Sequence, residues 1–331
     1  MKKWKSLSWL VLMLALVMGL AACGSDNASG NKDGGSASKG SGSYSLLTGG
    51  TGGTYYPLGG QFANLWEDAT GDKFTTQTTG ASAENMATLQ KGEAEVAFSQ
   101  TDIATYAVEG KEMFQEKIDG IKAIAALYPE TVQIVTTEKS GIDSIEDLKG
   151  KTVSVGAAGA GVNINAKQIL EVHGLTFDDI KPQNLSFEES TDGIQSGAID
   201  AAFITAGTPT GAVEGLSAQN KIKILNIGED KQKKLMEKYP FYAKDTIKSG
   251  TYGIDKDVNT VAVKAMLVAT DKLDEDTVYK MTKALFEADK INHAKGEFIK
   301  PETALEGLGD IEIHPGAAKY YKEKGIEKPN E

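Results

Sequence analysis

The chain has 331 residues, a formal net charge of −11 and no arginine. An acidic surface argues against nucleic acid as a partner and against electrostatic binding to a membrane, because both need positive charge on the protein. Without arginine the usual bidentate clamp on a carboxylate or phosphate is unavailable, so lysines, hydroxyls or helix N-termini must take its place.

Residues 1–22 have the pattern of a lipoprotein signal peptide. Three lysines within the first five residues precede a weakly polar to apolar run that ends at Ala22 and is short for a membrane span. Cys23, the single cysteine, follows Leu20-Ala-Ala, which resembles a lipobox. We therefore expect cleavage before Cys23, a lipid on its thiol and a net charge of −14 on the mature chain. An uncleaved membrane anchor is the alternative.

Residues 23–43 form the next segment, the lipidated cysteine followed by a run rich in glycine and serine with no apolar residue larger than alanine. Such a composition cannot bury enough surface to order itself, so we expect a flexible tether of roughly 25 Å root-mean-square reach. Residues 44–331 form a longer segment than a single hydrophobic core usually supports, and this length predicts two domains or lobes.

Strand-like and helix-like segments alternate along this body, which predicts an α/β fold. The first series has expected strands at 44–48, 73–78, 94–99, 121–128 and 131–138, and helices at 55–69, 82–91 and 102–109. The second has strands at 151–156, 184–187, 200–205 and 222–227, and helices at 162–173, 188–196, 209–217 and 230–238. A loop-rich stretch, a strand at 260–270 and helices at 274–289 and 316–324 complete the chain.

Two segments of the body are alike. Lys91 to Phe98 and Ser196 to Phe203 share Gly, an acid, Ala and Phe at equal spacing, 105 positions apart. Each is typical of a helix that ends at a glycine and is followed by a buried strand. We expect two topologically similar lobes joined by hinge strands, with lobe 1 at 44–139 and 255–331 and lobe 2 at 140–254.

A glycine-rich loop runs from Thr48 to Gly60, between an expected strand and an expected helix. Four glycines between Gly49 and Gly53 let a small ligand approach the backbone N–H groups at the helix start. The spacing does not match a dinucleotide fingerprint or a phosphate-binding P-loop. A tight turn that needs positive φ angles is the alternative.

Four loops open helices at the carboxyl ends of strands, where ligands bind in open α/β sheets. They are Gly49–Tyr55, Thr79–Ser82, Gly156–Asn163 and Ala206–Thr210. Several helix N-termini together can hold an anion, since each stabilises one by about 0.3–2 kcal/mol. Ser82 and Thr208 are expected either to contact the ligand or only to cap their helices, Thr208 as the N-cap before a proline at the first helical position.

Other side chains do not assemble into a catalytic, metal or cofactor site. His173 before Gly174 is typical of a helix C-terminus. Asp102 is expected either to bind a ligand ammonium group or to cap the next helix. Tyr55, Tyr56 and Tyr252 are candidates for the walls of a cleft or for half-buried core positions.

From Tyr44 almost to its end, the chain resembles the TAXI family of extracytoplasmic solute receptors, which serve TRAP-type transporters. The motifs that carry the resemblance are Thr48–Gly60, Thr79–Asn85, Gly92–Asp102, Ala123–Pro129, Asp147–Gly150 with Val153–Gly156, Ala206–Thr210 and His314–Gly316. The chain departs from the family at 156–161, where small residues stand in place of the Pro, Ser, Thr or Glu that members often carry.

The resemblance implies a type II periplasmic-binding fold and a small carboxylate ligand, glutamate, glutamine or a C4 or C5 dicarboxylate. It also implies a TRAP-type permease as partner and an extracytoplasmic place on the bacterial membrane, where the lipid on Cys23 would hold the receptor. We expect a monomer without catalytic activity, cofactor or metal. The alternatives are a ligand sensor for a signalling partner and an enzyme on the same bilobal fold. The implied ligand-binding residues are Thr51, Gly52, Tyr55, Ser82, Asn85, Gln100, Gly161, Asn163 and Thr208.

Overall fold

The computed structural model describes residues 42–329, so the predicted signal peptide, Cys23 and most of the predicted tether lie outside the described residues. The strands are β1 Ser43–Leu47, β2 Lys73–Gln77, β3 Val96–Gln100, β4 Ile121–Thr137, β5 Thr152–Ser154, β6 Lys181–Gln183, β7 Ala201–Ala206, β8 Ile222–Ile224, β9 Ala243–Ile247 and β10 Val258–Thr270. The α-helices are α1 Tyr55–Thr70, α2 Ser82–Lys91, α3 Thr101–Glu109, α4 Gly161–Val172, α5 Phe187–Ser196, α6 Gly211–Ser217, α7 Glu229–Lys238, α8 Glu275–Glu287 and α9 Pro315–Lys324.

The strands of the described body form one sheet in the order β2-β1-β3-β10-β4-β7-β5-β6, with β8 also paired to β4 and β9 to β10. β1 pairs in parallel with β2 and β3, and β5 pairs in parallel with β6 and β7. The loops that follow β1 and β2 therefore meet at one edge, as do those that follow β5 and β7. No helix within residues 42–329 is long and apolar enough to cross a membrane.

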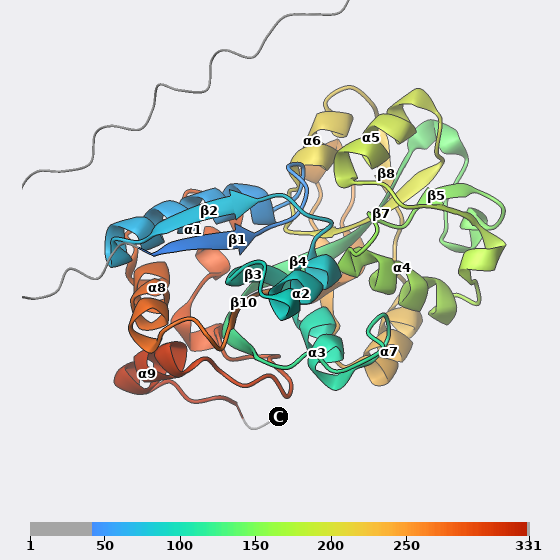
Figure 1. Cartoon of the computed structure of the whole chain (residues 1–331). Coiled ribbons are helices and arrows are strands. Elements are labelled where there is room, and N and C mark those ends of the chain that lie inside the picture. The colour runs from blue at the N-terminus through green and yellow to red at the C-terminus, as the bar shows by residue number, and fades with distance from the viewer. Residues whose placement is uncertain (1–41, 330–331) are drawn as a thin grey trace, which may run out of the picture. The chain divides into compact units, whose positions relative to one another are not determined.

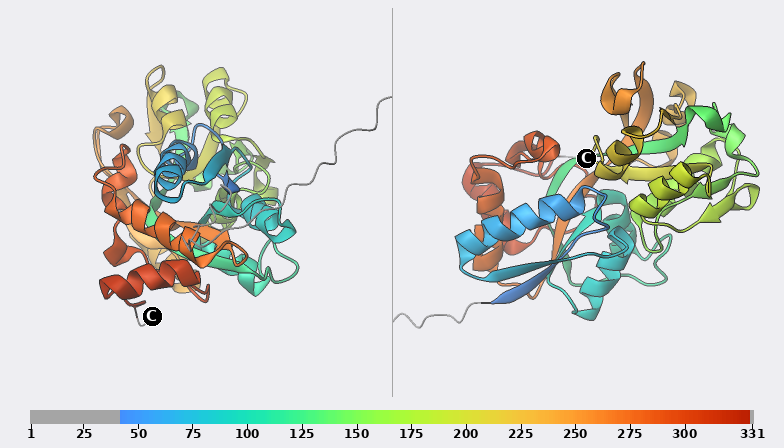
Figure 2. Two further views of the ribbon diagram at one scale, coloured as in Figure 1. Left: turned by 60° about the vertical axis from the view of Figure 1, so that its left-hand side comes forward. Right: turned by 90° about the horizontal axis from the view of Figure 1, so that it is seen from above.

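The hydrophobic core is divided between two lobes. The core of lobe 1 takes residues of β4 up to Tyr128 and residues of β10 from Ala265 onward. The cores of lobe 2 take residues of β4 from Val132 onward and residues of β10 up to Val263. Figures 1 and 2 show these two long strands running from one lobe into the other. The predicted lobe boundaries, at 139/140 and 254/255, stay a prediction.

The predicted elements are present apart from three differences. β4 is one continuous strand where two were expected, the expected strand at 184–187 lies at β6 instead, and β9 lies in the stretch predicted as loops. β6 and β9 are edge strands with largely exposed side chains. Such strands lack the apolar run that reveals a buried strand in a sequence.

Pro129 lies in the gap between the two strands that were expected at 121–128 and 131–138. A proline cannot donate a ladder hydrogen bond, so it indicates a break or an irregular position in a strand. In the structure Pro129 pairs with Lys264, beside a shift of the β4–β10 register between Lys264 and Met266. Such irregularities often re-aim a side chain next to a functional site, and the next residue along the strand is Glu130.

The predicted helix ends are confirmed at three glycines. Gly92 and Gly197 follow α2 and α5 with φ of 72° and 77°, and the strands after them, β3 and β7, are buried throughout. His173 is the C-cap of α4, its Nδ1 lies 2.7 Å from the carbonyl oxygen of Ile169, and Gly174 has φ of 79°. The internal likeness in the sequence therefore corresponds to a repeated helix–glycine–strand unit, one in each lobe.

Candidate functional site

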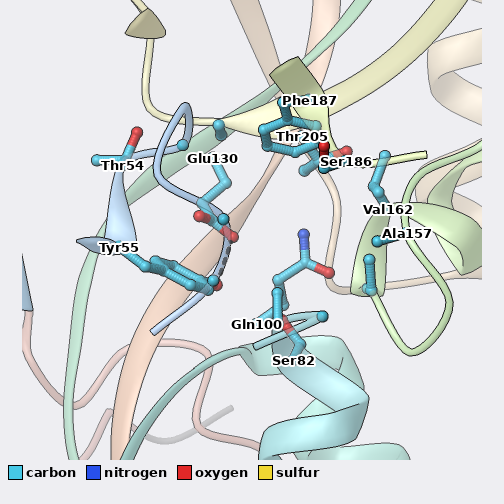
Figure 3. A pocket seen from close by; sticks show the side chains of 18 of the residues that line it. Thr54, Tyr55, Ser82, Gln100, Glu130, Ala157, Val162, Ser186, Phe187 and Thr205 are labelled. Carbon is cyan, nitrogen blue, oxygen red and sulfur yellow. Dashed lines mark hydrogen bonds between the residues drawn. The ribbon is translucent and has the colours of Figure 1, made fainter. Parts of the chain in front are cut away.

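A cavity lies between the two lobes (Figure 3). Its volume is about 590 Å³, open solvent at the mouth included. Lobe 1 contributes Gly49, Gly50, Gly53, Thr54, Tyr55, Thr79, Gly80, Ala81, Ser82, Gln100 and Glu130, and lobe 2 contributes Ala157, Ala160, Gly161, Val162, Ser186, Phe187, Thr205 and Ala206. The cavity is therefore completed only when the lobes come together.

Two long helices begin at this cavity, one from each lobe. Tyr55 is the first residue of α1 and Gly161 is the first residue of α4, and both line the cavity. The first N–H groups of a helix have no acceptor within the helix, and the helix dipole places partial positive charge there. The two helix starts thus supply what a carboxylate needs in a chain without arginine.

Two buried polar atoms on cavity residues have no hydrogen-bond partner within residues 42–329. They are Oε1 of Gln100 in lobe 1 and Oγ1 of Thr205 in lobe 2. A buried polar atom without a partner costs about 1–3 kcal/mol, a cost that a ligand supplying the partner removes. Their presence on opposite sides of one cavity indicates a site built to hold a polar ligand.

Glu130 is an acidic group in the cavity lining. Its side chain is 2% exposed, and its Oε2 accepts a hydrogen bond of 2.9 Å from the Tyr55 hydroxyl. Burial raises the pKa of the Glu130 carboxyl to about 8, against the opposing effect of the Tyr55 hydrogen bond. None of the lining residues is a lysine or histidine, so no basic side chain of the lining neutralises this carboxyl.

The glycine loop of lobe 1 contacts lobe 2 directly. The Gly52 N–H and the Thr51 hydroxyl both donate to Glu188 at the start of α5, and the Gly52 carbonyl oxygen accepts a 3.1 Å hydrogen bond from the Ala212 N–H. A Cβ on Gly52 would lie 2.7 Å from Cδ of Glu188. The loop glycines, Gly49 to Gly53, have no positive φ, so the turn alternative is wrong and close approach is the reason for glycine at Gly52.

The N-terminus of α2 is also occupied by the other lobe. The N–H groups of Ala83 and Glu84 donate to the carbonyl oxygen of Gly159, at 2.9 and 3.2 Å. The first turn of α6 is used in the same way, through Ala212 and Gly52. Of the four predicted loops, the two before α1 and α4 therefore lead into helices that begin at the cavity. The other two lead into α2 and α6, whose first turns bind the opposite lobe and help to hold the lobes together.

The implied ligand-binding residues separate into two groups. Tyr55, Ser82, Gln100 and Gly161 line the cavity, whereas Thr51, Gly52, Asn85, Asn163 and Thr208 are not part of its lining. Asn85 is fully buried, and its amide bonds Thr79 Oγ1 at 2.6 Å and the carbonyl oxygens of Thr48 and Phe98 at 2.7 and 2.8 Å. Its amide links the ends of β1 and β3, and these hydrogen bonds occupy both its oxygen and its NH₂ group.

The predicted capping roles of Ser82 and Thr208 are wrong. Ser82 is the first residue inside α2, where Ala81 takes the N-cap position, and its buried side chain faces Tyr55 (Figure 3). α6 begins at Gly211 with Thr210 as N-cap. Thr210 is held there because its N–H donates to the Tyr252 hydroxyl at 2.6 Å and its hydroxyl accepts from Gln133 at 2.8 Å. These are tertiary contacts that a local capping pattern does not contain.

Asp102 takes neither of its two predicted roles. It lies in the first turn of α3 with Gln100 as N-cap, and it does not line the cavity. Its Oδ2 accepts a 3.0 Å hydrogen bond from Asn165 of lobe 2. Of the tyrosine candidates, Tyr55 lines the cavity and stacks on Phe98 with ring centroids 4.8 Å apart, while Tyr56 is 39% exposed.

Three residues that line the cavity were not predicted from the sequence: Glu130, Thr205 and Phe187. The signal for Glu130 was a carboxyl inside a stretch, 121–137, whose only other charged residue is Lys122. The two strands expected at 121–128 and 131–138 left that carboxyl outside both. Thr205 and Phe187 carry no local signal, because a hydroxyl in a buried strand and an aromatic at a helix start are common core features.

Comparison with known proteins gives the class and the family. The fold is that of the two-lobed type II periplasmic binding proteins, as predicted. The model of the NMT1-like family matches residues 46–325, and the chain belongs to that family.

Solved structures of similar fold share little sequence with it. PhnD1 from Prochlorococcus marinus (MIT 9301), in complex with methylphosphonate, is 11% identical, with a TM-score of 0.51 over 86% of this chain and 97% of that one. MatC from Rhodopseudomonas palustris, with bound malate, is 12% identical, with a TM-score of 0.51 over 75% and 85%. A protein from Bordetella bronchiseptica RB50 is 18% identical, with a TM-score of 0.54 over 85% and 82%.

Proposed function

We propose that this protein is an extracytoplasmic solute-binding receptor that closes its two lobes over a small carboxylate and delivers it to a TRAP-type membrane permease. The observation that carries the proposal is the cavity between the lobes, where α1 and α4 begin and no basic side chain is present. The ligand-bound neighbours PhnD1 and MatC, whose ligands are a phosphonate and a dicarboxylate, support an anionic ligand for this fold.

Within the carboxylate class, Glu130 favours an amino acid such as glutamate or glutamine over a dicarboxylate. The α-carboxylate would lie at the starts of α1 and α4, and the ammonium group would pair with Glu130. A dicarboxylate has no cation to pair with this acid and would bind only while the acid is protonated, which becomes costly as the pH approaches the pKa of about 8.

A ligand screen tests this proposal. Thermal shift and then calorimetry on the purified protein would compare L-glutamate and L-glutamine with succinate and with glutarate, which has the glutamate skeleton without the ammonium group. We expect L-glutamate or L-glutamine to raise the melting temperature by several degrees at 100-fold excess over Kd, since such binding stabilises by about 2.7 kcal/mol. Tighter binding of glutarate than of both amino acids would contradict the assignment.

The lipid anchor is the second part of the proposed function, and it rests on Cys23 after Leu20-Ala-Ala. Two or more acyl chains hold a protein stably at a membrane, so Cys23→Ala should move the receptor from the membrane fraction to the soluble fraction. The measurement is fractionation with immunodetection, with Ser36→Ala, a change in the predicted tether, as the matched control. A Cys23→Ala protein that stays with the membrane contradicts lipid anchoring.

A further inference from the structure

Glu188, in the first turn of α5, occupies hydrogen-bond donors of the glycine loop. Its Oε1 accepts from both the Thr51 hydroxyl and the Gly52 N–H group. The family resemblance implied that these two residues contact the ligand, and neither of them lines the cavity. A carboxylate of the protein itself therefore takes the position that was expected for an anionic ligand.

The second oxygen of Glu188 lies beside the cavity wall. This Oε2 is buried and has no hydrogen-bond partner within residues 42–329. A Cβ on Gly50, which lines the cavity, would lie 3.4 Å from it. Both partners of Oε1 are neutral groups, so the hydrogen bonds hold the carboxylate in place without cancelling its charge. Glu188 thus places a negative charge close to the cavity.

The start of α5 is not available to a ligand anion. Ser186 Oγ accepts from the Glu189 N–H group at 3.2 Å, and Glu189 Oε2 accepts from the Ser186 N–H group at 2.8 Å. Glu188 and Glu189 also complement the dipole of this helix within its first turn. Since Gly159 occupies the start of α2, the starts of α1 and α4 remain for one ligand carboxylate.

The rest of the lobe 2 wall offers no basic group to a second negative charge. Its lining residues are mostly apolar, with two hydroxyls: Ala157, Ala160, Gly161, Val162, Phe187 and Ala206, with Ser186 and Thr205 (Figure 3). A second carboxylate on the ligand would leave water without gaining a cation, and Glu188 would repel it. An amide in its place is neutral, and its NH₂ group supplies donors for an acceptor such as Thr205 Oγ1, which has no partner within residues 42–329.

We propose that Glu188 is a specificity-determining residue, whose carboxylate closes the glycine loop to anions and disfavours a ligand with a negatively charged side chain. The inference rests on the proposed function for the α-carboxylate and the ammonium group of the ligand. It narrows that function to amino acids with an uncharged side chain. Between the two amino acids named there, the site selects L-glutamine over L-glutamate.

The first test compares these two amino acids on the wild-type protein. They have nearly the same size and differ in a terminal amide or carboxylate, so the ratio of their association constants isolates the effect of the charge. Calorimetry at pH 7 should give a ratio of roughly ten or more in favour of L-glutamine. L-Glutamate that binds as tightly as L-glutamine overturns the inference and leaves the proposed amino acid class standing.

The second test removes the charge of Glu188 and keeps its hydrogen bonds. Glu188→Gln retains an oxygen that can accept from Thr51 and Gly52. We expect the ratio to fall roughly tenfold, because L-glutamate is no longer repelled. Asp192→Asn is the matched control. It removes an exposed carboxylate one turn further along α5, where solvent screens the charge, and should leave the ratio unchanged.

The outcomes separate a role in specificity from a structural one. If Glu188 only holds the lobes together, Glu188→Gln weakens both ligands by the same factor and the ratio keeps its wild-type value, which overturns the inference. A ratio that falls in Glu188→Gln and not in Asp192→Asn supports it.

A further ligand pair distinguishes failure of this inference from failure of the proposed function. Succinamate and succinate differ by the same amide and carboxylate but lack the ammonium group. If they bind and neither amino acid does, the proposed amino acid ligand is overturned, and their own ratio tests Glu188 in the same two variants. Binding of none of the four compounds overturns both proposals.

Discussion

Glu130→Gln should weaken the binding of L-glutamate by about 100-fold or more. A hydrogen bond to a charged group contributes about 1.5–3 kcal/mol, and removing the charge opposite a buried ammonium group adds the cost of leaving that group unpaired. Glu130 is 2% exposed and lies in a lining with no other carboxyl. No neighbouring acid is therefore in place to replace it.

Calorimetry on the variant and on wild type measures this effect, with Glu116→Gln, an exposed acid of the same lobe, as control. The binding of glutarate should change little or improve, because glutamine removes a carboxyl that repels a dicarboxylate. Unchanged glutamate affinity in Glu130→Gln would show that the ammonium group, if present, is held elsewhere.

The pH dependence of ligand affinity tests the role of Glu130 independently. In the cavity without a cation the Glu130 carboxyl has a pKa of about 8, above its ordinary value of 4.5, so the closed site then favours the protonated form. A dicarboxylate needs the protonated form of Glu130, so its affinity should fall as the pH rises through about 8. An ammonium group stabilises the carboxylate, so the affinity for an amino acid should stay level or rise over pH 6–8.

Gly161→Ala should reduce ligand affinity by roughly 100-fold without lowering the stability of the ligand-free protein. Gly161 has no positive φ and opens a helix, where alanine is favourable. A Cβ there would contact Gln100 Oε1 and would lie 2.7 Å from Gln100 Cδ and 2.9 Å from Ile103 Cγ1, both across the lobe boundary. The added methyl group therefore obstructs closure and not the fold of either lobe.

The matched control is Gly215→Ala in α6, where a Cβ would meet no atom within 4 Å. Thermal melts should place both variants at or slightly above wild type, while calorimetry should show lost affinity in Gly161→Ala alone. Small-angle scattering with saturating L-glutamate should show compaction in wild type and in the control. Full compaction of Gly161→Ala would mean that Gln100 and Ile103 can move aside, and the argument from close approach would fail.

The elements of the fold could be predicted closely because their signals are local. The helix 82–91, for example, was predicted with the ends it has in the structure, since an apolar face and a C-terminal glycine lie within its own residues. The repeat of the Gly, acid, Ala and Phe pattern predicted a repeated unit for the same reason. Edge strand β9 was missed because its three central residues are polar and need only pair with β10, and that pairing is not local.

The candidate site could be predicted only in part. Tyr55, Ser82, Gln100 and Gly161 lie next to the helix starts that the glycine and hydroxyl pattern indicated, and these four line the cavity. Glu130 could not be placed, because the side of β4 that it faces depends on the register shift beside Pro129.

The sequence by itself determined the α/β pattern, the two lobes and the absence of arginine, and with it the need to hold an anion by helix starts. Tertiary structure decided which helix starts are available, since the first turns of α2 and α6 are occupied by Gly159 and Gly52 of the opposite lobe. It also decided that Glu188 meets the glycine loop, 137 positions away along the chain. Such pairings depend on how the two lobes pack against each other. The residues next to either partner in the sequence carry no signal of that packing.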